Sequence, residues 1–111
     1  MNAEELSQKL YDKMEAEQDA YRLELMRLPP EEILSKAYEY AMREDILSLM
    51  EDPELLTAKR CKALLTSSTP LADIYRHYAK MDCTYIESMR SAFEYCAEER
   101  IRQQKQQGQA R

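Results

Sequence analysis

The sequence predicts an all-α protein, folded as a compact, mainly antiparallel bundle of about four helices with a long C-terminal helix. Apolar residues recur at spacings of three and four along most of the chain, which is the period of an α-helix with one buried face. The four prolines fall at three places between these periodic segments, and no stretch has the alternating pattern of a β-strand. A chain of 111 residues is long enough for one core, so we expect one domain.

The first helix is expected over residues 3–27 and the second from about residue 30 to 50. Proline fits the first turn of a helix, so Pro30, Pro53 and Pro70 mark the starts of the second, third and fourth helices. Asp52 and Thr69 stand where a capping side chain is needed. In the first helix the apolar residues share one side, namely Leu6, Leu10, Met14, Tyr21, Leu25 and Leu28.

The fourth helix is expected to be the longest and to run without a break from Pro70 to about residue 102. Its apolar residues keep an alternating spacing of three and four over more than three heptads. They are Leu71, Ile74, Tyr78, Met81, Tyr85, Met89, Ala92 and Cys96. Residues 103–111 are rich in glutamine and lack this period, so we expect a helical domain over residues 1–102 followed by a disordered polar tail.

Each long helix carries one carboxylate within its apolar stripe: Glu17, Asp45 and Asp82. We expect these three residues to form a buried polar layer, satisfied by tyrosine or arginine side chains, because unpaired buried carboxylates are costly. Two alternatives are a groove in which the acids bind a partner's arginine or lysine, and a site for a hard cation. We expect no metal, since the only histidine, His77, is rotated away from Asp82 on the helix.

The outer side of the second helix is a candidate contact surface. Tyr40 lies about 200° from Tyr38 around the helix and is therefore expected to face outward. Tyrosine is amphipathic and common at binding surfaces. The residues we expect to contact a partner are Glu39, Tyr40, Arg43 and Glu44.

The charge distribution indicates the kind of partner. Residues 1–55 hold 15 acidic and 6 basic side chains, whereas residues 56–111 hold 6 acidic and 10 basic ones. An acidic face repels bare nucleic acid, so a protein with a basic surface is the expected partner and direct nucleic-acid binding is not.

Enzymatic chemistry, cofactors and membrane insertion are not expected. There is no glycine-rich turn to bind a phosphate, and no combination of nucleophile and base stands out. No window approaches the apolar run that spans a bilayer, and the start MNAEELSQKL does not look like a signal peptide. The three cysteines form no CxxC pair, which suits reduced thiols in the cytoplasm.

Three segments resemble a bacterial family of unknown function: LPPEEILSKAYEYAMREDIL (28–47), ALLTSSTPLADIY (63–75) and QKLYDKM (8–14). The likeness covers most of residues 6–86, and no useful match is expected from Met89 onward. That family occurs in prophages and conjugative elements of gut bacteria and has no established catalytic residues.

We expect a non-enzymatic interaction module, and the resemblance implies that it belongs to a mobile genetic element. One form of this function is an inhibitor of a host defence nuclease, as in anti-CRISPR proteins, which occludes a basic surface of a bacterial defence effector. The alternative is a structural or scaffolding module that forms a homodimer through the stripe of its last helix. The sequence leaves open the target, the oligomeric state, and whether the domain acts alone or fused to a larger protein.

Overall fold

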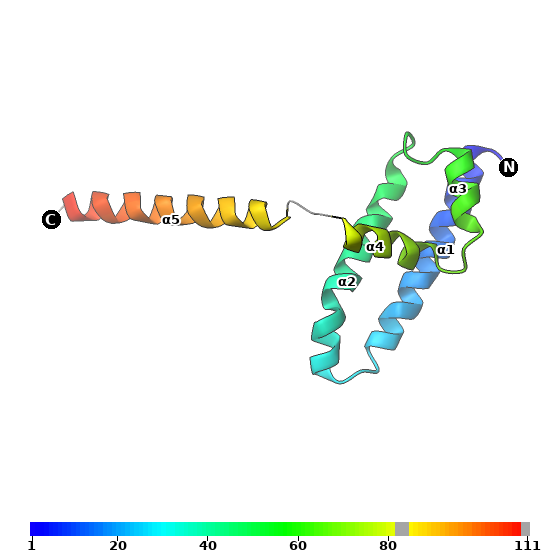
Figure 1. Ribbon diagram of the computed structural model, residues 1–111, viewed down its shortest axis with the longest axis horizontal. Coiled ribbons are helices and arrows are strands. Elements are labelled where there is room, and N and C mark those ends of the chain that lie inside the picture. Colours follow the sequence, from blue (N-terminus) through cyan, green and yellow to red (C-terminus); the bar gives the residue numbers. More distant parts are fainter. Residues whose placement is uncertain (82–84, 110–111) are drawn as a thin grey trace. The chain divides into compact units, whose positions relative to one another are not determined.

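The computed structural model describes residues 1–81 and 85–109 and is all-helical within them (Figure 1). The described chain contains five α-helices and one short 3-10 helix. They are α1 (Ala3–Leu25), α2 (Pro30–Ser48), η1 (Leu49–Glu51), α3 (Ala58–Leu65), α4 (Pro70–Lys80) and α5 (Tyr85–Gln109). This confirms the all-α class. The chain divides into two compact units, Met1–Lys80 and Met81–Arg111.

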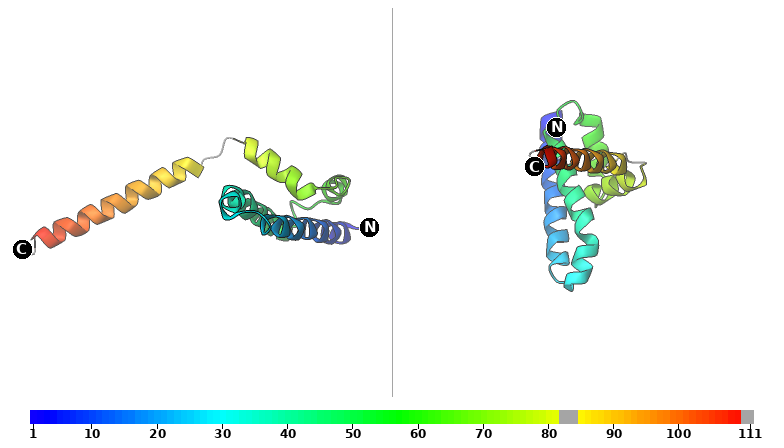
Figure 2. Two further views of the ribbon diagram at one scale, coloured as in Figure 1. Left: turned by 90° about the horizontal axis from the view of Figure 1, so that it is seen from below. Right: turned by 90° about the vertical axis from the view of Figure 1, so that its left-hand side faces the viewer.

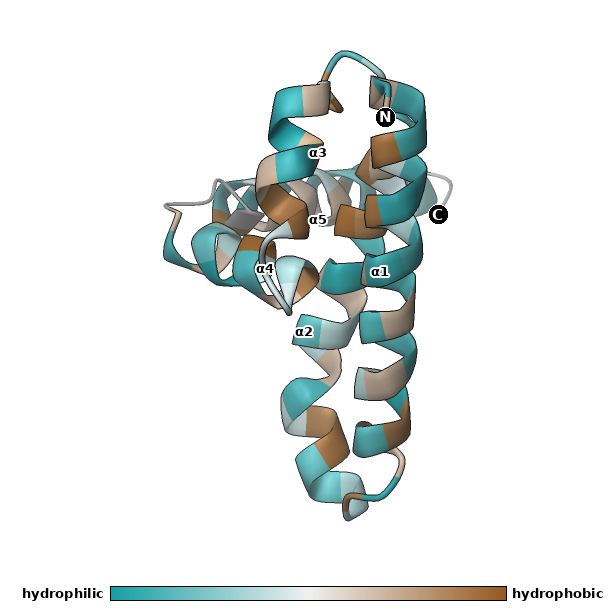
Figure 3. Cartoon of the chain, turned by 90° about the vertical axis from the view of Figure 1, so that its right-hand side faces the viewer, coloured by the Kyte–Doolittle hydropathy of each residue, from teal (hydrophilic) through white to brown (hydrophobic). Residues whose placement is uncertain are grey.

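The first unit is built on the antiparallel pair α1 and α2, which contact each other and lie side by side in the right-hand view of Figure 2. Helix α3 packs on α1, and α4 contacts both α1 and α2. Its core consists of Leu6, Leu10, Met14, Ile46, Cys61 and Leu71. Apolar segments of α1 and α3 lie where these two helices approach each other (Figure 3). The α1 stripe therefore packs inward as its spacing predicted.

The expected third helix begins later than Pro53. Instead, Asp52 accepts a hydrogen bond from the Glu54 backbone N–H at 3.0 Å, which holds the chain in a turn. Helix α3 begins at Ala58, because the Thr57 hydroxyl accepts from the Arg60 backbone N–H and so caps its first turn.

The expected continuous helix from Pro70 to residue 102 is wrong. Helix α4 ends at Lys80, Met81 lies in a bend, and α5 begins at Tyr85. Helix α5 extends to Gln109 and so reaches into the segment that we expected to be a polar tail. Glutamine, arginine and lysine are good helix formers and can continue a helix without an apolar face. No helix within residues 1–81 and 85–109 is long and apolar enough to cross a membrane.

Candidate binding groove between α1 and α2

Gln18 lies at one end of a groove between α1 and α2. Only 3% of its surface is exposed. Its amide nitrogen donates to the Tyr40 carbonyl and to the Glu44 carboxylate, both at 3.1 Å. Because both of these partners are acceptors, the nitrogen must face them. The Gln18 carbonyl oxygen is then buried with no hydrogen-bond partner in the described part of the chain. A buried acceptor without a donor is costly and marks a place where a ligand's donor would be stabilising.

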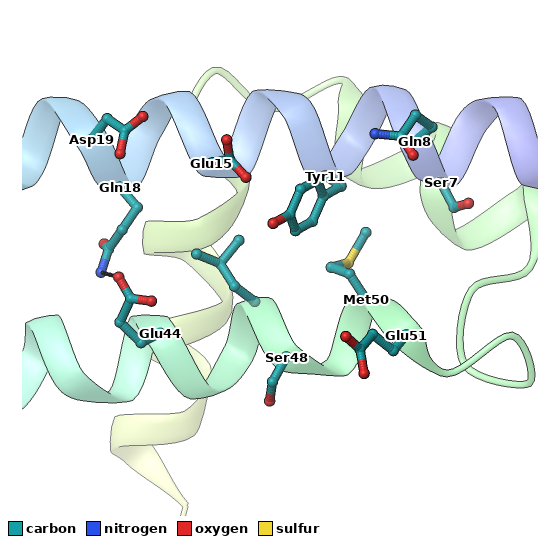
Figure 4. A pocket seen from close by; sticks show the side chains of 11 residues that line it. Ser7, Gln8, Tyr11, Glu15, Gln18, Asp19, Glu44, Ser48, Met50 and Glu51 are labelled. Atoms are coloured by element: carbon teal, nitrogen blue, oxygen red, sulfur yellow. Dashed lines mark hydrogen bonds between the residues drawn. The ribbon is translucent and has the colours of Figure 1, made fainter.

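The groove has a volume of about 560 Å³ and an acidic lining. Figure 4 shows Tyr11 and Gln18 projecting from α1 toward α2, with Glu44 reaching back to Gln18. Four carboxylates contribute to the lining, and the described residues that form it include no lysine or arginine. The lining residues are Ser7, Gln8, Tyr11, Glu15, Gln18, Asp19, Glu44, Leu47, Ser48, Met50 and Glu51. Like charges gathered around one concavity create a negative potential that attracts a cationic group.

Two tyrosines near the groove have raised pKa values. The pKa of Tyr11 is raised, first because its hydroxyl bonds to the Glu15 carboxylate and also because of that group's charge. The pKa of Tyr40 is raised by burial, and the Glu44 carboxylate adds to the effect. Each phenol therefore stays neutral to a higher pH than an ordinary tyrosine does.

The expected contact residues divide between two sides of α2. Glu44 lines the groove, and the Tyr40 carbonyl binds Gln18. Arg43, which we expected to face outward, is buried instead. Its guanidinium donates twice to Glu39, at 2.5 and 3.0 Å. It also lies 3.9 Å from a Glu17 carboxylate oxygen and 4.0 Å from the centre of the Tyr21 ring. Arg43 and Glu39 thus serve the packing of α1 on α2.

Glu17 has a structural role within the first unit. Its two carboxylate oxygens accept from the backbone N–H groups of Leu71 and Ala72, each at 2.9 Å. These are free donors in the first turn of α4, where a negative charge is favourable. Glu17 therefore caps α4 from α1, at the place where we expected Thr69 to act.

The expected polar layer of three carboxylates does not form as proposed. Asp45 is exposed, because α2 packs through Ile46 and Arg43, which lie about 100° and 200° around the helix from it. Asp82 lies outside the described residues. No cluster of histidine, cysteine or carboxylate side chains suited to a metal ion occurs within the described segments.

Sequence reasoning missed Gln18. It lies four residues after Met14 and three before Tyr21, so it occupies the apolar stripe of the first helix. A glutamine at a core position needs hydrogen-bond partners, and that signal was present in the spacing.

Fold and groove together define a small all-helical protein with an acidic cleft between its two longest packed helices. The family model of DUF3848, a protein of unknown function, matches residues 6–101, and the chain belongs to this family. The expected membership in a family of unknown function is confirmed, and the match continues past Met89, where we expected none. Neither a curated protein nor a solved structure matches the chain.

Proposed function

We propose that this protein is a non-enzymatic interaction module whose α1–α2 groove binds arginine or lysine side chains on a basic protein surface. The observation that carries the proposal is the unpaired Gln18 oxygen at a groove whose lining holds four carboxylates: Glu15, Asp19, Glu44 and Glu51. A guanidinium or ammonium group supplies the donors and the positive charge that this lining lacks. The excess of acidic residues within 1–55 also attracts a positively charged partner, over a longer range.

The composition of the groove favours binding over catalysis. Its described lining offers carboxylates, hydroxyls and amides, with no histidine or cysteine to serve as a nucleophile or base of the usual kind. Its negative potential also disfavours nucleic acid as a direct ligand. An origin in a mobile genetic element and a bacterial defence effector as partner are expectations from the resemblance alone, and both stay predictions.

A titration of the labelled protein with a short arginine-rich peptide tests the groove directly. We expect the largest changes in NMR chemical shift at the Gln18 side-chain amide, because that group lies at the proposed contact. Changes spread evenly over all acidic surfaces would overturn a specific site. Binding should weaken with salt, since exposed charges are screened over about 10 Å at 0.1 M.

A matched pair of charge reversals separates the groove from overall charge. Glu15→Lys changes a lining residue, whereas Glu24→Lys makes the same change at an exposed position of α1 that does not line the groove. Only Glu15→Lys should weaken peptide binding, by about 1 kcal/mol or roughly fivefold. Equal losses in both variants would mean that only the net charge matters. Capture from host lysate with the same pair then identifies the natural partner.

A further inference from the structure

The acidic groove between α1 and α2 has carboxylates at both of its ends. Gln18 and Glu44 lie at one end, and Glu51 lies at the other, close to Met50 (Figure 4). A second hollow of about 430 Å³ shares Met50 and Glu51 with the groove and adds the Glu4 carboxylate to the lining. A ligand that fills the groove therefore meets negative charge at two places rather than one.

The two acidic ends are about two helical turns apart on one side of α2 and η1. Glu44 and Glu51 are seven residues apart in the sequence. Rises of about 1.5 Å per residue in α2 and about 2.0 Å in the 3-10 helix η1 place their backbones about 12 Å apart along the axis. Seven residues complete almost two full turns, which explains why both side chains line the same groove.

Apolar side chains line the groove between its acidic ends. Tyr11, Leu47 and Met50 belong to the lining, and each is half-buried. Leu47 follows Glu44 by one turn and precedes Glu51 by another. Partly exposed apolar side chains flanked by carboxylates fit a ligand that has an apolar centre and a positive charge on either side of it.

The walls of the groove favour an α-helix as the ligand. They are formed by α1 and α2, and α3 and α4 pack behind this pair, so the groove opens on the opposite side (Figures 2 and 4). A helix laid along two antiparallel helices packs as in a helical bundle, with about 8–10 Å between axes. An extended peptide would lack partners for its backbone groups, because α1 and α2 use their own backbone groups internally.

We propose that the groove binds an amphipathic α-helix of a partner protein, with basic residues seven positions apart and an apolar residue between them. This mode of binding rests on the proposed function and adds the spacing and the conformation of the basic groups. One basic side chain reaches the Gln18 oxygen and Glu44, and the other reaches Glu51 and Glu4. Seven positions of a helix span about 10 Å, and the long side chain of arginine covers the remaining difference.

Two alanine-rich helical peptides of identical composition test the spacing. Each carries two arginines and one leucine, with the arginines at positions i and i+7 in one peptide and at i and i+5, about 140° apart, in the other. In fluorescence anisotropy with the full-length protein, the i, i+7 peptide should bind about fivefold more tightly, as expected for one more exposed ion pair. Equal affinities would overturn the spacing and leave the proposed function intact. Absence of binding by both peptides would overturn the proposed function as well.

A proline between the two arginines tests the conformation of the ligand. It breaks the peptide helix and keeps both charges. We expect this peptide to bind at least about fivefold more weakly than the i, i+7 helix, because it must leave backbone groups unpaired in the groove. Equally tight binding of the proline peptide would show that an extended chain occupies the groove and would overturn the helical mode.

A matched pair of substitutions tests the second acidic end. Glu51→Gln removes a charge from the groove, whereas Glu54→Gln removes the same charge at an exposed position outside the lining. Only Glu51→Gln should weaken binding of the i, i+7 peptide, by about threefold because Glu4 remains. Neither substitution should affect a peptide with a single arginine, which binds at the Gln18 end. Equal losses in the two variants, or the same loss for both peptides, would overturn the second contact.

Discussion

Charged residues on two sides of α2 differ in burial and in their partners. Arg43 is buried, and its guanidinium is bonded to Glu39 and lies over the Tyr21 ring. Asp45, two positions later, sits among apolar neighbours yet is exposed, and its carboxylate makes no hydrogen bond or ion pair within the described residues. Apolar spacing alone predicted the reverse. The comparison teaches that available partners, more than apolar neighbours, decide which charged residue a small helical protein buries.

The largest loss of stability should come from a substitution of Arg43, on the side of α2 where the charged residues have partners. Arg43→Ala leaves the carboxylates of Glu17 and Glu39 near each other without a cation, and removing one member of a buried ion pair costs about 3–5 kcal/mol. Urea unfolding followed by circular dichroism measures the loss. Lys36→Ala, an exposed basic residue of the same helix, should change stability by no more than about 0.5 kcal/mol. If the two variants lost the same stability, the buried role of Arg43 would be refuted.

A smaller loss of stability is expected when the Glu17 carboxylate, which caps α4, is replaced. Glu17→Gln replaces one accepting oxygen by a donor that faces a backbone N–H group of α4, and hydrogen bonds to charged groups contribute about 1.5–3 kcal/mol. We expect a loss of about 2 kcal/mol in the same urea experiment. Glu15→Gln, two residues earlier and exposed, is the control. If Glu17→Gln were as stable as the wild type, the Glu17 carboxylate would not contribute to the stability of α4.

The pH dependence of stability tests the role of Asp73, whose partners Ser67 and Arg76 lie close to it in the sequence. The Ser67 hydroxyl, which donates to Asp73 at 2.6 Å, and the positive charge of Arg76 hold the pKa of Asp73 below its ordinary value of 3.8. A lowered pKa means that Asp73 stabilises the fold above the unfolded-state pKa, and that this contribution is lost as the pH falls through the folded-state value. Asp73→Asn should therefore flatten the loss of stability below about pH 4, measured by urea unfolding across pH.

A second variant isolates the hydrogen bond at Asp73. Ser67→Ala removes the donor and keeps the carboxylate, so part of the flattening should appear there too. An acid profile identical to that of the wild type in both variants would show that the site does not contribute.

The smallest effect is expected on the exposed side of α2. Asp45→Asn should change the free energy of unfolding by no more than about 0.5 kcal/mol, because the first unit gives its carboxylate no partner. A loss comparable to that of Arg43→Ala would mean that Asp45 is buried after all and would reverse the comparison between the two sides of the helix.

The sequence predicted helix class and several boundaries well because these depend on local chemistry. Pro30 and Pro70 begin α2 and α4, and Leu6, Leu10 and Met14 form the buried side of α1. The start of α3 was missed because Pro53 suits a turn as well as a helix, and Asp52 stabilises the turn.

The candidate site was predicted only in part. Glu44 was selected because it shares the outer side of the second helix with Tyr40, and it does line the groove. The burial of Arg43 and the exposure of Asp45 were predicted the wrong way round. Helix α2 has two apolar sides, and apolar spacing alone does not show which side packs against α1. Gln18 was missed because its importance depends on Tyr40 and Glu44, which come from another helix.

The contact between Glu17 and the first turn of α4 has a consequence for the order in which the first unit folds. Helix α4 has 11 residues, too few to persist alone in water. Its first turn depends on a carboxylate that precedes it by 54 positions along the chain. Helix α4 should therefore form only after α1 is in place, and amide protons in the two helices should exchange through one shared opening event.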